Sequence, residues 1–503
     1  MKLFVIDKIK LSQNKKFLIL LFLFFFSLIL RILWVDFESA WIDEAYSIQL
    51  SAKTIKEIII GCINDQHPPL FYIILKFWMG NSLNVSRARL LSVLIGSITI
   101  IQVFFILRKL QFTDWKSIII ACLFISISPM HIWYSQEARM YIMLLFFTLL
   151  SLYSFINIVF NPLQDKQGNT FLFWIFFILI NIFSLYLHYF SIFIIIFEFT
   201  FFLYAIKRKW LKPKQCKFGL FSFFTIGLGF LPWSPVLINQ FLMHKLAWIS
   251  EPTFFSIIAS INRLILGPIV VFLSDGLNVI VFLSFLVLVI FGIKKINITQ
   301  NNENLSYLFL VSWFFIPILL IITFSLFSPI FQFKQLIIVL VPAITIIILT
   351  VGILLKKFGK ILLLGLLVIN FCSTIYQQIN MTKDDWRGLT KYIEEKYEYG
   401  DLLFFNSSSG QLGFDLYSNK DVAIAGYPHN YDVIKGGWDG NIVNMETESV
   451  NLEKLKLEHQ RIWYVQYYPD LWDPDELLHS WFVDNYEVKY DKSFGSILLK
   501  LFY

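Results

Sequence analysis

Residues 17–35, FLILLFLFFFSLILRILWV, form an almost uninterrupted apolar run, and residues 39–47, SAWIDEAYS, follow it closely. A helix needs about 20 apolar residues to cross a bilayer, and the run has this length. Asp43 and Glu44 therefore stand just beyond the end of a predicted membrane helix. Acids at such a depth are costly and usually face a cavity or water. The stretch predicts a membrane protein whose chemistry lies beside its first helix.

The composition of the 503 residues indicates the same class of protein. Hydrophobic residues make up 57% of the chain and charged residues 15%. The net charge of +7 is uneven, because residues 379–503 carry 12 Lys and Arg against 21 Asp and Glu, whereas residues 1–378 carry 30 against 14. The basic excess thus belongs to the membrane region, as a topology signal, and does not indicate nucleic-acid binding. Four scattered cysteines predict no disulfide framework.

The positive-inside rule orients the predicted spans. Lys15 and Lys16 place the N-terminus in the cytoplasm, and residues 207–217, with six basic residues and no acid, mark a cytoplasmic loop. We expect about 11 to 13 transmembrane helices, with 254–273 lying in the interface or re-entering the membrane, and with separate late spans at 335–355 and 361–378. The expected fold class is a polytopic α-helical membrane domain over residues 1–378, followed by a small soluble α/β domain over residues 379–503. Both the first outer loop and that domain are predicted outside the plasma (inner) membrane.

Local patterns place the shorter elements. The first outer loop, residues 36–88, is expected to carry juxtamembrane helices at 45–60 and 70–78. A short helix at 117–128 is expected to stop at Pro129 and to be followed by a loop. In the C-terminal domain, a helix is predicted at 391–399 and strands at 402–405, 461–465 and 496–502. No Gly-rich phosphate loop occurs in that domain, so nucleotide binding is not indicated.

Two interpretations of Asp43 and Glu44 stay open. Acids favour the first turn of a helix, where they complement the helix dipole, and this explains the pair structurally. Alternatively, one carboxylate is a general base that takes the proton of an attacking hydroxyl. The same loop holds Asp65 and His67 before a stiff Pro68-Pro69 pair. His67 could bind phosphate, or it could join Glu44 in a divalent metal site.

Several cations are predicted on the outer side, against the positive-inside bias. Arg89 begins the second span, Arg139 follows Tyr134 and Glu137 in the next outer loop, and Lys334 lies in a late one. Interfacial snorkelling and a mutual Glu137–Arg139 ion pair are the structural explanations. The functional explanation is a lipid-linked phosphate, which the guanidinium fork matches.

The chain resembles membrane glycosyltransferases of the GT-C class, in particular the protein O-mannosyltransferase and lipid A aminoarabinose transferase group (glycosyltransferase family 39-like). Asp43-Glu44 resembles that group's first-loop acidic motif. Residues 65–70, DQHPPL, are similar to the Asp-x-His-Pro-Pro-Leu of the mannosyltransferases. Arg89-Leu90 and residues 137–141, EARMY, resemble helix ends of bacterial members. Those members often have Arg-Tyr in the late loop, where this chain has Lys334-Gln335.

The resemblance implies an inverting transfer of a sugar from a polyprenyl phosphate to a hydroxyl of an extracytoplasmic lipid, glycan or protein. Asp43 would be the base and Glu44 its neighbour; Arg89, Arg139, His67 and Lys334 would bind the donor phosphate. Asp65, Tyr134 and Glu137 would contact substrate. No cofactor is certain, and a divalent metal stays open.

The rival hypothesis is a transporter or flippase of lipid-linked sugars, which would place its charges in mid-span. Here the charges gather in predicted outer loops, and Glu198 is an exception. A sensor or assembly protein whose C-terminal domain is the working part ranks last, because that domain shows no site of its own.

Overall fold

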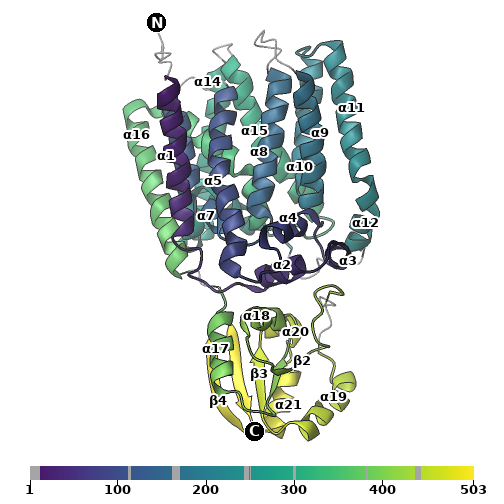
Figure 1. The fold of residues 1–503 in the computed structure, drawn as a ribbon. Helices are drawn as coiled ribbons and strands as arrows, with labels where there is room; N and C mark the ends of the chain where they lie inside the picture. Colours follow the sequence, from purple (N-terminus) through teal and green to yellow (C-terminus); the bar gives the residue numbers. More distant parts are fainter. Residues whose placement is uncertain are drawn as a thin grey trace. The chain divides into compact units, whose positions relative to one another are not determined.

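A computed structural model describes residues 12–110, 115–160, 170–242, 249, 251–297, 302–380, 383–436 and 443–503. The chain forms two compact units (Figure 1). Unit 1 comprises residues 1–34, 89–239 and 249–380; unit 2 comprises residues 35–88, 240–248 and 381–503. The first outer loop therefore belongs to the same unit as the C-terminal segment. Each unit is described by itself below.

Unit 1 is a bundle of helices, and α8 packs against α9 as α10 does against α15. Its helical elements are α1 (Gln13–Ile32), α5 (Val85–Lys109), α6 (Trp115–Ile127), α7 (Pro129–Ser135), α8 (Tyr141–Phe160), α9 (Thr170–Leu187), α10 (Ser191–Lys207), α11 (Pro213–Phe230), η2 (Leu231–Trp233), α12 (Ser234–Leu242), α13 (Phe254–Leu266), η3 (Gly267–Phe272), α14 (Asp275–Asn297), α15 (Asn302–Ser325), η4 (Phe333–Val339) and α16 (Leu340–Asn380). Two of these helices, α5 and α12, include residues of unit 2.

These helices make the chain an integral membrane protein. Within the described residues, eight helical stretches are long and apolar enough to cross a membrane, or nine if the bent pair α6–α7 is one span. Two of them, Pro213–Leu242 and Asp275–Lys294, bury only 17% and 22% of their apolar windows. Apolar surface on that scale is not stable in water and indicates contact with lipid. The predicted class of membrane protein is confirmed.

The two late spans expected at 335–355 and 361–378 correspond to two apolar stretches long enough to cross a membrane, Phe333–Gly352 and Gly359–Asn380, and α16 takes part in both. One local expectation in unit 1 is wrong. The loop expected after Pro129 begins as a helix, because Pro129 occupies the first turn of α7. Proline suits that position, where its missing N–H would have no helical partner. The axis bends by 56° between α6 and α7.

The first outer loop in unit 2 folds into three short helices, α2 (Ile42–Ala52), α3 (Ile55–Asn64) and α4 (Leu70–Met79). The single helix expected at 45–60 is broken at Lys53-Thr54. Thr54 caps α3 through a reciprocal pair of hydrogen bonds with Glu57, which is the capping-box pattern. The helix expected at 70–78 is present as α4.

The rest of unit 2 is a small α/β domain, as predicted. Its sheet has the order β2-β1-β3-β5-β4, with β1 parallel to β2 and β3, and β5 antiparallel to β3 and β4. The elements are α17 (Trp386–Lys396), β1 (Leu402–Phe405), α18 (Gly410–Tyr417), β2 (Ala423–Gly426), α19 (Met445–Glu458), β3 (Ile462–Gln466), α20 (Pro469–Trp472), α21 (Leu477–Asn485), β4 (Val488–Phe494) and β5 (Ile497–Phe502).

The core of this domain explains why β1 and β3 are predictable from the sequence. Every residue of β1 and of β3 is buried, so each reads as a short apolar run. Phe404, Tyr464 and Phe502 pack in one cluster with Phe482 of α21. The strands β2 and β4 lie at the edges of the sheet. The strand β4 is exposed except at its last residue, and β2 is only partly buried, so neither strand is buried throughout as β1 and β3 are.

Candidate active site

The adjacent acids of the first-loop motif occupy different environments in unit 2. Both lie in the first turn of α2, where a carboxylate is favourable to the helix dipole. The Glu44 side chain is fully buried, and its Oε2 accepts a hydrogen bond of 2.9 Å from Nζ of Lys383. Asp43 is half-buried instead. The ion pair neutralises Glu44, whereas Asp43 is the acid of the pair that reaches the surface.

The segment leading into α2 is fastened to the C-terminal domain. The backbone N–H of Ala40 donates to the Tyr417 hydroxyl at 2.7 Å. Asp36 Oδ1 lies 3.2 Å from Nη2 of Arg387, and the backbone N–H of Arg387 donates to Ser39 Oγ. Farther along α2, Gln49 Nε2 donates to the carbonyl of Leu412 at 2.9 Å. The first loop and the C-terminal domain therefore hold the acidic motif together.

The Asp65–His67 pair forms as the sequence indicates. His67 Nδ1 lies 3.2 Å from Asp65 Oδ2, and the following Pro68 and Pro69 are buried. Burial raises the pKa of Tyr46 on α2 well above its ordinary value, and the nearby Asp65 carboxylate raises it further. Asp65 itself is buried, at 8% exposure.

A metal site built on His67 and Glu44 finds no support in these contacts. His67 is engaged by Asp65 and Glu44 by Lys383. Among the residues that the structure describes, no group of three or more His, Cys, Asp or Glu side chains could hold a metal ion.

The remaining predicted site residues lie in unit 1, and all but Lys334 are buried. Arg89 is 2% exposed, Glu137 and Arg139 are 3% exposed, and Tyr134 is 8% exposed. Gln136 fixes the turn that carries Glu137 and Arg139, since its Nε2 donates to the carbonyl of Arg31 and its Oε1 accepts from Gln378, both at 2.9 Å. Arg89, Glu137 and Arg139 therefore lie in the interior of unit 1.

Lys334 belongs to an aromatic and basic group that we call the Tyr141 cluster, defined as Tyr134, Tyr141, His188, Arg263 and Lys334. Lys334 Nζ lies 5.4 Å from the centre of the Tyr141 ring. Tyr134 packs on Tyr141 at 5.2 Å between ring centres, and His188 lies 6.0 Å from the same ring. Glu137 and Arg263 are electrostatic neighbours of Tyr134. The cluster gathers cations around two phenols.

Arg263 and His188 were not among the predicted site residues. Arg263 stands within the apolar stretch 254–273, so its charge reads as an interfacial anchor, and His188 sits between two apolar runs. A cation inside a long apolar segment is the signal that would have singled out Arg263. Its guanidinium lies 4.5 Å from the centre of the Phe333 ring, beside Lys334 in the sequence.

A second group that was not predicted from the sequence lies in the interior of unit 1. The Arg31 guanidinium is fully buried and contacts Ser135 Oγ at 3.2 Å and His131 Nδ1 at 2.6 Å. Its Nη1 donates to the carbonyl of Ser27 at 2.7 Å. These contacts join α1 to α7, just before the turn that carries Glu137 and Arg139. Arg31 is thus a structural support of that turn.

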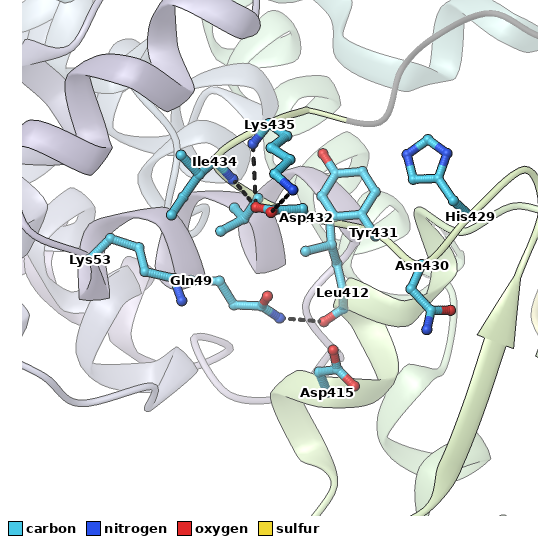
Figure 2. A pocket seen from close by; sticks show the side chains of 11 residues that line it. Gln49, Lys53, Leu412, Asp415, His429, Asn430, Tyr431, Asp432, Ile434 and Lys435 are labelled. Carbon is cyan, nitrogen blue, oxygen red and sulfur yellow. Dashed lines mark hydrogen bonds and ion pairs between the residues drawn. The ribbon is translucent and has the colours of Figure 1, made fainter.

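Unit 2 also contains a polar pocket of about 580 Å³ along α2 (Figure 2). Gln49 and Lys53 line it from the first loop, and Asp415 and residues 429–435 line it from the C-terminal domain. Within the pocket wall, Asp432 accepts hydrogen bonds from the backbone N–H groups of Ile434 and Lys435. The pocket is therefore a second polar surface on the helix that begins with the acidic motif.

No family model matches the chain, and no curated protein matches its sequence. Solved structures match its fold. ArnT from Cupriavidus metallidurans in the apo state matches at a TM-score of 0.58 and 13% identity, over 97% of this chain and 98% of that chain. The same protein bound to undecaprenyl phosphate matches at 0.56 and 11% identity, with the same coverage. These matches confirm the predicted fold class.

Two other structures match over different extents. The oligosaccharyltransferase AglB from Archaeoglobus fulgidus, in complex with an inhibitory peptide and a dolichol-phosphate, matches at a TM-score of 0.55 and 12% identity, over 97% of this chain and 74% of that chain. The O-mannosyltransferase complex Pmt1-Pmt2 of S. cerevisiae, bound to the sugar donor, matches at 0.38 and 15% identity, over 47% of this chain. This match spans 35% of that protein's length, and at that score it adds nothing to the comparison.

Proposed function

We propose, from the premise that this chain has the GT-C fold of membrane glycosyltransferases, that it transfers a sugar from a polyprenyl phosphate to a hydroxyl group of an extracytoplasmic acceptor. ArnT has been solved with undecaprenyl phosphate and AglB with dolichol-phosphate. A lipid-linked donor also suits chemistry outside the cytoplasm, where nucleotide sugars are not available. The sugar itself and the acceptor are left open by this proposal.

Asp43 is the general base in this proposal. The observation that carries the assignment is the unequal state of the two acids, since Glu44 is neutralised by Lys383 and Asp43 is half-buried at the surface. Asp43 takes the proton of the acceptor hydroxyl as its oxygen bonds to the anomeric carbon. The bond from that carbon to the phosphate oxygen breaks, its electron pair goes to the phosphate, and the configuration inverts. Glu44 acts as a positioning residue through its ion pair.

Arg89, Arg139 and Lys334 bind the donor phosphate in this proposal. The phosphate gains negative charge as the bond breaks, so fixed cations stabilise the transition state more than the ground state. The two arginines are buried, and a buried cation needs less reorganisation of water during the reaction than an exposed one. Tyr134 and Glu137 are then substrate-contacting neighbours. His67 is placed less favourably, because Asp65 engages its Nδ1 atom.

The test compares Asp43→Asn with the wild type in membranes given a labelled polyprenyl-phosphate sugar. We expect transfer to fall at least 100-fold, which is a magnitude typical of losing a general base. Glu57→Gln is the matched control, since Glu57 is a surface acid that caps α3 in the same loop, and it should transfer normally. Wild-type transfer by Asp43→Asn would remove Asp43 from the mechanism.

The acidic motif and the C-terminal domain are proposed to face away from the cytoplasm. In a cysteine-free background, Tyr399→Cys should react with an impermeant thiol reagent on intact cells, because Tyr399 is fully exposed. Lys214→Cys, at the start of α11 in the basic stretch 207–217, should react only after lysis. The reverse pattern would contradict the orientation.

A transporter is the weaker alternative. Glu198 is the mid-span acid that a transporter would need. Its Oε1 accepts a hydrogen bond of 2.6 Å from Ser151. Asn181 in turn donates to the Ser151 hydroxyl at 2.8 Å. This contact network ties α8, α9 and α10 together and gives Glu198 a structural role.

A further inference from the structure

The turn after β3 holds a residue in an uncommon backbone conformation. Tyr468 has φ of 45° and ψ of 56°, which is the left-handed helical region. A side chain in this region costs about 1 kcal/mol or more relative to the right-handed form. Strain of this kind persists only where the surroundings over-determine it, and it is concentrated at functional sites. A functional role of this turn would account for the conformation of Tyr468.

Contacts on both sides keep this turn in place. The backbone N–H of Tyr467 donates to Oδ1 of the buried Asn406 at 2.7 Å. The Tyr467 ring is 3% exposed and packs on Trp386 at 5.1 Å between ring centres. The Tyr468 ring lies 4.4 Å from that of Tyr467 and is 46% exposed. The buried Tyr467 ring thus supports the exposed Tyr468 ring.

Two carboxylates accompany this ring pair. The ion pair of Glu44 with Lys383 brings residues 43–44 beside residues 383–384. Burial raises the pKa of Tyr467 and of Tyr468, and the carboxylates of Asp384 and Asp43 raise both further. Both phenols therefore keep their protons at neutral pH. The segment that begins at Lys383 links the two sites, because Lys383 pairs with Glu44, next to the proposed base, and Trp386 packs on Tyr467.

We propose that the Tyr467–Tyr468 turn of the C-terminal domain is the acceptor platform of this enzyme, and that it binds an uncharged saccharide ring whose attacking hydroxyl lies at Asp43. This inference rests on the proposed function. An exposed tyrosine ring offers an apolar face to the C–H groups of a sugar and a hydroxyl at its edge. The carboxylate of Asp43 accepts hydrogen bonds from sugar hydroxyls, as does Oδ2 of Asp384, whose Oδ1 accepts from the N–H and the hydroxyl of Ser496.

The charge of this surface sets the class of acceptor. Asp43 and Asp384 repel a phosphate or carboxylate on the acceptor, and the nearby cation Lys383 is engaged by Glu44. A neutral sugar meets the platform without that repulsion. A peptide acceptor would gain little from a stacking surface unless it carried an aromatic residue next to its hydroxyl. The platform therefore favours a neutral saccharide over an anionic or a peptide acceptor.

The experiment exploits the strained backbone. Tyr468→Gly removes the ring and relieves the left-handed strain, so the variant should melt at the wild-type temperature or above it. Glu476→Gly is the matched control, because Glu476 also has a left-handed φ, of 52°, in the same domain. Both variants should be at least as stable as the wild type, and only Tyr468→Gly should lose acceptor binding.

Binding is measured without donor, on the full-length protein in detergent, by saturation-transfer NMR with maltotriose, chitotriose and mannotriose and with a Ser/Thr-containing hexapeptide. We expect the wild type and Glu476→Gly to bind at least one trisaccharide, and Tyr468→Gly to bind it at least tenfold more weakly. Tyr468→Phe should fall between them. Equal binding by Tyr468→Gly, binding of the hexapeptide alone, or no binding by the wild type would each overturn the platform.

Because this assay contains no donor, its result is separate from the test of Asp43. Loss of transfer in Asp43→Asn together with unchanged saccharide binding in Tyr468→Gly would keep the glycosyltransferase and reject the platform. Saccharide binding that depends on Tyr468, with normal transfer by Asp43→Asn, would keep the platform and reject the base.

Discussion

The Nζ atom of Lys383 lies 2.9 Å from Oε2 of Glu44, and the two side chains are 8% and 0% exposed. The residues are 339 positions apart in the sequence. Their ion pair joins the first turn of α2 to the segment that opens the C-terminal domain. Since Asp43 precedes Glu44 directly, the pair also fixes the backbone on which the proposed base is carried.

Breaking this ion pair from one side should destabilise unit 2 strongly. Lys383→Met leaves the Glu44 carboxylate buried without its cation, which typically costs about 3–5 kcal/mol. The double variant Lys383→Met with Glu44→Gln removes the charge and should recover much of the loss. Thermal unfolding in detergent measures both, and Lys435→Met, at an exposed lysine of the same domain, is the control. A single variant as stable as the wild type would contradict a buried, charged pair.

The buried arginines of unit 1 should affect the donor and not the acceptor. Arg89→Gln and Arg139→Gln remove a fixed charge, so we expect kcat/KM for the polyprenyl-phosphate sugar to fall by about 100-fold or more, equivalent to about 3 kcal/mol. Replacement by Lys should recover only part, because a lysine lacks the fork that matches phosphate.

The neighbouring Arg87 provides the control for these variants. It lies two residues before Arg89 and is exposed, with Nη2 donating to the carbonyl of Trp78 at 3.1 Å. Arg87→Gln should transfer sugar at close to the wild-type rate. An equal loss in Arg87→Gln and Arg89→Gln would indicate a general requirement for surface charge and no specific phosphate contact.

Asp415 in the polar pocket should make the stability of unit 2 depend on pH. Burial raises the pKa of its carboxyl to about 6 from an ordinary value of 3.8. Between these values the native state binds more protons than the unfolded chain, so the contribution of Asp415 to stability falls as the pH rises. Because Asp415 is nevertheless an exposed residue by its solvent-accessible surface, water screens its carboxyl and the change is small.

Asp415→Asn removes this titration. The melting temperature of the variant should match the wild type near pH 4 and exceed it near pH 7, as measured by thermal unfolding in detergent. Asp421→Asn, at an exposed acid of the same domain, should show no such divergence. A wild type that gains stability relative to Asp415→Asn as the pH rises would reverse the sign and contradict the raised pKa of the Asp415 carboxyl.

The sequence by itself determined the features that depend on local apolar pattern. Long apolar runs identify membrane helices, and short buried runs identify β1, β3 and β5, because burial on that scale leaves a pattern in consecutive residues. The edge strands β2 and β4 were not predicted, since strands that are not buried throughout need no such pattern. The break between α2 and α3 was readable in principle, because Thr54 and Glu57 have the spacing of a capping box.

The sequence likewise indicated some features of the candidate site, and only the tertiary structure gave the others. Residue types and resemblance indicated Asp43, Glu44, Arg89 and Arg139, because acids and cations beside membrane helices are costly and uncommon. The resemblance already implied Asp43 as the base and Glu44 as its neighbour. Only the tertiary structure gave a physical difference between them, by pairing Glu44 with a cation from a distant segment. Only the tertiary structure, too, packed Tyr467 on Trp386, close in sequence to that cation. Pairing of distant side chains depends on how whole elements pack, and no local pattern carries that information.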